Sequence, residues 1–205
     1  MKMIWCFDLW FTLIKPLSTI TRTYADVLVE AGVSRNLIFP IVRDNFMTRR
    51  LSYAELNEFV CSCFNITDER VLAKARERWI AENQNIRWIG NASYVLQKIH
   101  ERGDLLVLIT NTTEMGWRDA NTILGIAPFF TQMFLSWEQG LAKPNPKVFT
   151  RVMSWFPNAD PTQFVMVGDS ETDDIENPSR LGWKTFLTNE GIDDVLDRFS
   201  KKENV

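Results

Sequence analysis

Histidine, cysteine and long apolar segments are scarce in this chain, and each scarcity argues against a class of function. Among 205 residues there is one histidine, His100, and the three cysteines, Cys6, Cys61 and Cys63, lack the spacing of a zinc site or a disulfide framework. No run approaches the roughly 20 apolar residues that span a bilayer, and the first residues lack the pattern of a secretory signal peptide. We therefore expect a cytoplasmic protein with reduced thiols and no membrane partner.

Positive charge is also scarce. The formal net charge is -3, and no basic run appears beyond the pairs Arg49-Arg50 and Lys201-Lys202. Such a balance provides no overall attraction for nucleic acid or anionic lipid, so we expect no nucleic-acid partner. The sequence leaves the oligomeric state open.

The chain does contain the composition of a globular protein and an alternation of strands and helices. Hydrophobic residues make up 45% of the chain and charged residues 24%. Nearly continuous apolar runs, which are typical of strands covered on both faces, lie at 3–8, 105–110, 131–136, 164–168 and 184–188. Helical stretches lie between them at 91–102, 114–124, 146–156 and 171–181. This alternation predicts an α/β fold with a Rossmann-like, doubly wound parallel sheet.

Residues 16–86 differ, because they contain no convincing strand. Their periodicity predicts amphipathic helices near 18–31, 35–48, 52–64 and 67–83. Ser52 with Glu55 fits a capping box at the start of the third of these helices. We interpret 16–86 as a helical cap inserted into a core domain that is formed by 1–15 and 87–205.

Polar residues follow three of the predicted strands. Asp8 comes after "MIWCF", Thr110 and Asn111 come after "LLVLI", and Asp169 comes after "VMVG". Because ligands of an open parallel sheet bind beyond the carboxyl ends of its strands, we expect these side chains to converge on one crevice. Lys143, in the proline-containing stretch "GLAKPNPKVF", is a fourth candidate. Each feature alone has an ordinary structural explanation, such as a turn or a solvated lysine, but four of them in this order indicate a site.

The acidic residues of this crevice need compensation. Asp8, Asp169 and one or both of Asp173 and Asp174 would bring three or four carboxylates together, and their mutual repulsion would raise their pKa values. One lysine does not offset that charge. A hard divalent cation such as Mg²⁺ does, and Mg²⁺ prefers carboxylates, water and phosphate oxygens as ligands. The sequence therefore predicts a Mg²⁺ site that handles phosphoryl groups.

In order and spacing, these stretches resemble the four motifs of the haloacid dehalogenase (HAD) superfamily of hydrolases, over essentially the whole chain. "FDLWFTL" is similar to the first motif, "LITN" to the second, "GLAKPNPKVF" to the third and "VMVGDSETDDI" to the fourth. The helical block lies where one subclass of the family carries a cap, between the first and second motifs. The resemblance implies a hydrolase with a Rossmann-like core.

The resemblance also implies a role for the matched acidic positions. Asp8 would be the nucleophile, which attacks phosphorus to give an aspartyl-phosphate. The backbone carbonyl of Trp10 would join Asp8 and Asp169 in binding Mg²⁺. Asp174 lies at the spacing of the second acidic residue of the fourth motif, and Asp173 is its acidic neighbour.

Three further positions would contact the substrate, which is expected to be a phosphorylated small molecule. Thr110 would hydrogen-bond the transferred phosphoryl group, and Lys143 would balance the charge on Asp8 and the phosphate. Asn111, next to Thr110, is a further candidate for substrate binding.

Trp10 departs from the family pattern. Phosphatases of this family typically carry an aspartate two residues after the nucleophile, which protonates the leaving alcohol and then activates water. An indole does neither, and general acid–base catalysis contributes roughly 10²–10⁴ in rate. We therefore expect a slow hydrolase, or one limited to leaving groups that depart as anions, such as those of acyl or aryl phosphates.

Two alternatives stay open. Dehalogenases of the family also lack this aspartate and usually have tyrosine there, so hydrolysis of a 2-haloacid is a rival activity. They work without a metal and do not need the acidic cluster of "GDSETDD". The fold could instead serve as a catalytically weak binding or regulatory protein, although Asp8, Thr110, Lys143 and Asp169 would then have no evident use.

Overall fold

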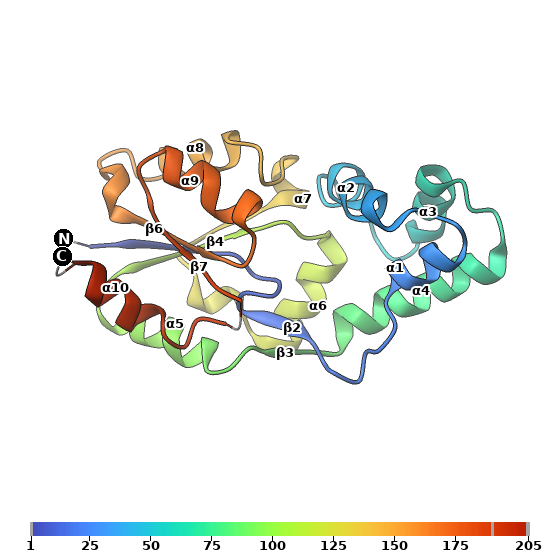
Figure 1. Cartoon of the computed structure of the whole chain (residues 1–205), viewed down its shortest axis with the longest axis horizontal. Helices are drawn as coiled ribbons and strands as arrows, with labels where there is room; N and C mark the ends of the chain where they lie inside the picture. Colours follow the sequence, from blue (N-terminus) through green and yellow to red (C-terminus); the bar gives the residue numbers. More distant parts are fainter. Residues whose placement is uncertain (1, 190, 204–205) are drawn as a thin grey trace.

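A five-stranded parallel sheet forms the centre of the protein, seen in a computed structural model that describes residues 2–189 and 191–203 (Figure 1). The strands are β1 (Ile4–Phe7), β4 (Leu105–Thr110), β5 (Gln132–Leu135), β6 (Phe164–Gly168) and β7 (Lys184–Leu187). Their spatial order is β5-β4-β1-β6-β7, with every neighbouring pair parallel. The predicted α/β fold with a parallel sheet is confirmed. Residues 1, 190 and 204–205 of the predicted core domain lie outside the described residues.

Alternate residues of the central strand point to two separate hydrophobic cores. Trp5 and Phe7 belong to one cluster, and Ile4 and Cys6 belong to another. The first cluster contains side chains from α5 (Ala92–Glu101), α6 (Glu114–Leu124) and α10 (Val195–Glu203). The second contains side chains from α8 (Lys147–Ser154), and α9 (Glu176–Arg180) lies on the same side of the sheet (Figure 1). Burial on both faces explains why the strands read as nearly continuous apolar runs.

Four helices lie at one end of the molecule, away from the sheet (Figure 1). They are α1 (Tyr24–Glu30), α2 (Arg35–Asn45), α3 (Leu56–Phe64) and α4 (Glu69–Gln84), and residues 24–84 are called the helical segment below. This segment has a hydrophobic cluster of its own, in which the ring of Phe46 lies 4.3 Å from that of Phe59 and 5.0 Å from that of Trp79. Met115 of α6 also belongs to this cluster, so the helical segment packs on the sheet region at α6.

The expectation of no strand within 16–86 was wrong at both ends of that range. β2 (Ile14–Pro16) and β3 (Ile86–Trp88) form an antiparallel two-stranded sheet. Each is three residues long, which is too short for a strand to show an alternating pattern. The pair joins the two places where the chain passes between the sheet and the helical segment. It lies across both predicted domain boundaries, and the division of the chain into 1–15, 16–86 and 87–205 stays a prediction.

Several predicted helix ends shift for local reasons. Glu55 accepts hydrogen bonds from the backbone N and the hydroxyl of Ser52, but these form a turn before α3, which begins at Leu56. The helix predicted at 67–83 is α4, which Asp68 caps by accepting a hydrogen bond from the backbone N of Arg70. The predicted helix 171–181 begins as a π-helical turn, η3 (Glu171–Ile175), before α9.

Among the described residues, two helices were not predicted, α7 (Ser136–Gln139) and α10.

Two short 3-10 turns complete the elements, η1 (Ala127–Phe129) and η2 (Pro161–Gln163). Within the described residues, no helix combines the length and the apolar composition that crossing a bilayer requires.

Candidate active site

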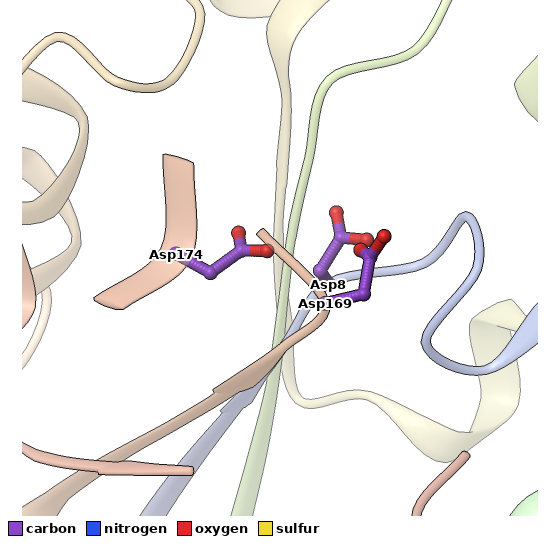
Figure 2. Close-up of side chains that lie close together, drawn as sticks. All are labelled: Asp8, Asp169 and Asp174. Carbon is purple, nitrogen blue, oxygen red and sulfur yellow. The ribbon is translucent and has the colours of Figure 1, made fainter. Parts of the chain in front are cut away.

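Asp8 and Asp169 lie side by side because their strands are neighbours. Phe7 of β1 pairs with Val167 of β6, and the backbone N of Asp8 donates a hydrogen bond to the carbonyl of Val167 at 3.0 Å. Both acids therefore leave the sheet at its carboxyl edge, and Figure 2 shows their carboxylates next to each other. The convergence predicted from the strand ends is present for this pair.

Asp174 reaches the same place through the π-helical turn that follows β6. The hydroxyl of Ser170 accepts a hydrogen bond from the backbone N of Asp173 at 3.2 Å, and the backbone N of Ser170 donates to Oδ2 of Asp174 at 3.1 Å. These bonds fold the turn back toward the sheet, so that the Asp174 carboxylate points toward Asp8 and Asp169 (Figure 2). Asp174, rather than its neighbour Asp173, is the third member of the cluster.

Gly168 makes this approach possible, and sequence reasoning missed it. A Cβ built on Gly168 would lie 2.2 Å from Oδ2 and 2.3 Å from Cγ of Asp174, which is far inside van der Waals contact. A side chain at position 168 would therefore push the third carboxylate out of the cluster. The glycine before the fourth-motif aspartate was the sequence signal that could have revealed this requirement.

The three carboxylates form a set that suits a hard cation. Asp8, Asp169 and Asp174 each offer one oxygen, and these oxygens lie within 4.8 Å of one another. Asp8 and Asp174 are buried and Asp169 is partly buried. Oxygen atoms from two or three carboxylates, with room left for water, are the ligands that Mg²⁺ uses in proteins, so the residues present fit this ion.

Lys143 lies between two of these acids. Its Nζ donates to Oδ1 of Asp8 at 2.8 Å and to Oδ1 of Asp174 at 2.5 Å, and the residue is only 2% exposed. Burial alone would lower the pKa of Lys143, but attraction to Asp174 and Asp8 raises it above the ordinary range. Lys143 is therefore held as a cation.

One lysine does not balance the negative charge. Burial raises the pKa of Asp8 to about 7, and repulsion from Asp174 and Asp169 adds to the rise, although Lys143 opposes it. Burial also raises the pKa of Asp169, with repulsion from Asp174 as the next cause. These shifts have the direction expected of a cluster that lacks enough positive charge.

Asn111 holds the backbone at Lys143. Its Nδ2 donates to the carbonyl of Lys143 at 2.9 Å, and its Oδ1 accepts from the backbone N of Lys143 at 2.8 Å. Asn177 of α9 fixes the next residue, because its Nδ2 donates to the carbonyl of Pro144. Sequence reasoning predicted Asn111 for substrate binding and missed this positioning of the lysine loop. Asn111 also lines the cleft described below.

Two threonines of the first and second motifs differ in their contacts, and Thr110 is not among the described residues that line the cleft. Thr110 ends β4 and is 1% exposed, and its Oγ1 has no hydrogen-bond partner among the described residues. Thr12 lies between two of the acids: its Oγ1 is 3.4 Å from Oδ2 of Asp8 and 3.3 Å from Oδ1 of Asp169. Thr12 was not predicted, although a lone threonine within the apolar run "LWFTLI" was a visible signal.

Trp10 is fixed at the edge of the site. Its Nε1 donates to Oγ1 of Thr112 at 3.2 Å, and the Thr112 hydroxyl in turn donates to the carbonyl of Thr113 at 3.3 Å. The next residue, Phe11, has a left-handed backbone (φ 64°) and is 56% exposed. The indole thus occupies a defined place beside Asp8, with no acidic group at this position. Binding of a metal by the Trp10 carbonyl stays a prediction.

A cleft of about 530 Å³ lies above the acids and reaches the helical segment. Its floor, as the name is used below, consists of Asp8, Lys143, Asp169 and Asp174. Its roof consists of apolar and aromatic residues of α1, α2, α4 and the turn after α2, namely Tyr24, Ile38, Phe39, Met47 and Trp79. Trp10, Phe11 and Glu82 also line the cleft. A volume of this size is typical of small-molecule sites.

The four sequence motifs lie within the region that matches a known protein family. The sequence model for haloacid dehalogenase-like hydrolases matches residues 6–188, which include all three acids, Lys143 and the helical segment. The chain belongs to the haloacid dehalogenase-like hydrolase family. Membership confirms the family resemblance drawn from the motifs.

A curated relative in this family is a glyceraldehyde 3-phosphate phosphatase of Pyrococcus abyssi, 32% identical over 100 residues. Another is a phosphoserine phosphatase of Thermus thermophilus, 27% identical over 116 residues. The matches cover 49% and 57% of this chain, but only 42% and 46% of those relatives. The chain thus spans less than half the length of each of these two relatives.

Solved structures share the fold at low sequence identity. A HAD family enzyme of Bacteroides thetaiotaomicron, crystallised with magnesium and inorganic phosphate, has a TM-score of 0.64 at 17% identity, covering 93% of this chain and 96% of that one. A 2-haloacid dehalogenase of Pseudomonas syringae pv. tomato has a TM-score of 0.61 at 20% identity, covering 92% and 87%. At such identities the likeness concerns the fold alone.

Proposed function

We propose that this HAD hydrolase is a Mg²⁺-dependent phosphatase of a phosphorylated small molecule and works through an aspartyl-phosphate on Asp8. The observation that carries the proposal is the floor of the cleft, where three carboxylate oxygens lie within 4.8 Å of one another and a buried lysine contacts two of the three acids. Curated relatives named as phosphatases and a magnesium-complexed structural neighbour agree with it.

Asp8, Asp169 and Asp174 would hold the ion. Bound there, Mg²⁺ would supply the positive charge that lets these acids stay ionised next to a substrate phosphoryl group. The Lys143 cation adjoins both Asp8 and Asp174, so it attracts the same phosphoryl group and adds to the positive charge that favours an ionised Asp8.

The reaction then involves two displacements at phosphorus. An Asp8 carboxylate oxygen forms a bond to phosphorus, and the bond between phosphorus and the leaving oxygen breaks, with the electron pair going to that oxygen. Water then attacks the aspartyl-phosphate, which releases inorganic phosphate and restores Asp8. The unpartnered hydroxyl of Thr110 is a donor for the transferred phosphoryl oxygens.

Because position 10 carries tryptophan instead of an acid, the enzyme is limited in the leaving groups that it can release efficiently. The indole N–H is bound to Thr112 and is not acidic, so the leaving oxygen receives no proton from this position. Because such protonation is worth roughly 10²–10⁴ in rate, we expect efficient turnover only of esters or anhydrides whose leaving group departs as an anion.

The helical segment would act as the cap that covers the substrate, since the cleft is enclosed between it and the sheet edge. A cytoplasmic location and the cap boundaries 16–86 remain part of this proposal.

A 2-haloacid dehalogenase is the second candidate, favoured by the missing acid at Trp10. Its carboxylate substrate would meet three acids with one lysine among them, which disfavours binding of an anion when no cation is present.

One paired assay separates the two functions. Phosphate release from p-nitrophenyl phosphate should depend on Mg²⁺ and stop with EDTA, whereas chloride release from 2-chloropropionate should be absent. Asp8→Asn should remove phosphate release by about 10⁴-fold or more, because the nucleophile is lost. Chloride release without Mg²⁺, or phosphate release that survives Asp8→Asn, would overturn the proposal. Failure of both assays would favour the binding or regulatory alternative.

A further inference from the structure

The floor and the roof of the cleft differ in chemistry. The floor carries the proposed nucleophile Asp8, the lysine and the acids proposed to hold Mg²⁺, so a bound phosphoryl group must lie there. The rest of the substrate must then extend toward the roof, because floor and roof line one continuous cavity. The chemistry of the roof therefore indicates what is attached to the phosphate.

We propose that the roof binds an aromatic leaving group, so that the preferred substrates are phosphate monoesters of phenols or similar flat aryl alcohols. This proposal rests on the phosphatase function proposed above and specifies its substrate class. Three observations carry it: the rings and apolar side chains of the roof, the hydrogen bonds that already engage Thr23 and Asn83 on the helical side of the cleft, and the fixed indole of Trp10.

The roof presents a ready aromatic surface. The rings of Tyr24 and Trp79 are stacked, with centroids 4.0 Å apart and planes 21° from parallel. Phe39, on α2, lines the cleft and remains 47% exposed, and Phe11, on the sheet side, lines it and is 56% exposed. Exposed rings facing a cleft gain by covering another flat apolar group, since aromatic pairs contribute beyond simple area burial.

Two polar side chains on the helical side of the cleft, those of Thr23 and Asn83, already have partners within the protein. Thr23 Oγ1 donates to Asp26 and also accepts from the backbone N of Asp26. Nδ2 of Asn83 donates to the hydroxyl of Tyr53. A polyol chain, such as that of a sugar phosphate, would find these two side chains already engaged and would lose hydrogen bonds to water.

The charges also disfavour a second anionic group on the substrate. Among the described residues that line the cleft, the cations are Lys143, which is bound to Asp8 and Asp174, and Arg35, which is paired with Asp26. Glu82 lines the cleft with a carboxylate, whose Oε1 accepts from the backbone N of Tyr24 at 2.5 Å. A substrate carboxylate would find no free cation among these lining residues, and above about pH 7 it would also be repelled by Glu82.

Tryptophan at position 10, which supplies no proton, also favours aryl phosphates as substrates. A phenolate leaves as an anion far more readily than an alkoxide, so its departure does not require the acid that the fixed indole fails to supply. In the first displacement, a bond forms between an Asp8 carboxylate oxygen and phosphorus as the bond between phosphorus and the aryl oxygen breaks. The phenolate carries the electron pair away and takes its proton from water.

Binding can be measured without turnover by titrating the Mg²⁺-loaded protein with non-hydrolysable phosphonates in a calorimeter. We expect 1-naphthylphosphonate to bind at least tenfold more tightly than methylphosphonate, since burying the ring system against the roof removes on the order of 100 Å² of apolar surface from water. Equal affinity for the two phosphonates would overturn the proposal.

Two matched variants on one helix locate the effect. Phe39 and Leu37 are both exposed residues of α2, at 47% and 51%, but only Phe39 is a roof residue. Phe39→Ala should lower the ratio of naphthylphosphonate to methylphosphonate affinity by about 5- to 10-fold. Leu37→Ala should leave this ratio unchanged. An equal effect of the two variants would contradict binding at the roof.

Turnover distinguishes failure of this inference from failure of the phosphatase proposal. We expect a higher kcat/KM for 1-naphthyl phosphate than for glyceraldehyde 3-phosphate, and a lower ratio of the two in Phe39→Ala than in Leu37→Ala. A preference for glyceraldehyde 3-phosphate would overturn the aryl specificity and leave the phosphatase function standing. No Mg²⁺-dependent phosphate release from either ester would overturn both.

Discussion

The floor and the roof of the cleft are built in opposite ways. On the floor, Lys143, Asp8 and Asp174 are almost fully buried and fix one another through short polar contacts, and Asn111 fixes the lysine from behind. On the roof, apolar side chains of separate helices meet the cavity, and Phe39 leaves much of its surface exposed. The difference indicates that the floor is organised before substrate arrives, whereas Phe39 of the roof gains contacts from the substrate.

We expect the largest loss of activity on the floor from a substitution that displaces Asp174. Gly168→Ala would place a Cβ about where the Asp174 carboxylate lies, so the third acid must move. We expect activity to fall by about 10³-fold and Mg²⁺ affinity, measured by calorimetry, to fall with it. Gly103→Ala, at the opposite edge of the sheet, meets no atom within 4 Å of its new Cβ and should cost only backbone strain. Normal Mg²⁺ affinity in Gly168→Ala would show that Asp174 is not a ligand.

Trp10→Asp places an acid at position 10, where phosphatases of the family typically carry one. We expect hydrolysis of an alkyl phosphate such as glycerol 2-phosphate to rise by about 10²-fold, at the lower end of general acid–base effects. Trp10→Asn is the matched control, because it removes the indole and its bond to Thr112 without adding an acid. A gain in both variants would mean that the indole only obstructs the cleft, and a gain in neither would mean that the missing acid is not the limitation.

Asn111→Ala tests whether the floor depends on its supporting bonds. The variant loses both hydrogen bonds to the Lys143 backbone. We expect kcat to fall by about 10- to 100-fold with a smaller change in KM, because the lysine would be displaced from Asp8. Asn85→Ala, which loses a side-chain bond to the Ala81 carbonyl only, should retain kcat. Equal kcat values for the two variants would argue against a positioning role of Asn111.

Glu82→Gln gives the smallest effect and concerns stability near the roof. Burial, opposed in part by the Tyr24 backbone N–H, raises the pKa of Glu82 from 4.5 to about 7. The unfolded chain therefore loses this proton at lower pH than the folded chain, and stability falls as pH rises from about 4.5 to 7. Above pH 7 the variant should be more stable than the wild type by about 1–3 kcal/mol in urea unfolding.

The difference in stability between Glu82→Gln and the wild type should depend on pH. Below pH 4, where Glu82 is protonated in both states, the variant and the wild type should unfold at similar urea concentrations. A stability difference that stays constant from pH 4 to 8 would show that the Glu82 carboxylate does not titrate as its burial implies.

The floor was largely predictable from the sequence, whereas the roof was not. Asp8 and Asp169 follow apolar runs, and parallel strands bring such positions to one edge, so local patterns sufficed. The choice of Asp174 over Asp173 depends on a π-helical turn, and the role of Gly168 depends on the closeness of that turn. Neither is visible in hydrophobic periodicity.

The remaining features depend on contacts between distant segments. Asn111 and Lys143 are 32 residues apart, and their paired hydrogen bonds follow from how two loops meet. Phe39 and Trp79 come from helices whose periodicity was clear, but periodicity does not show which side chains reach a cleft shared with another part of the chain. Three-residue strands such as β2 and β3 are likewise below the length at which a pattern can be recognised.

The central claim is that Asp8, Asp169 and Asp174 share one divalent ion while Asp8 accepts a phosphoryl group. A crystal structure of the protein with Mg²⁺ and beryllium fluoride tests it most directly. We predict Mg²⁺ bound to oxygens of this acid cluster, and a beryllium fluoride group bonded to an Asp8 carboxylate oxygen within reach of the Lys143 ammonium. Beryllium fluoride on another residue, or a cluster without the ion at saturating Mg²⁺, would contradict the account.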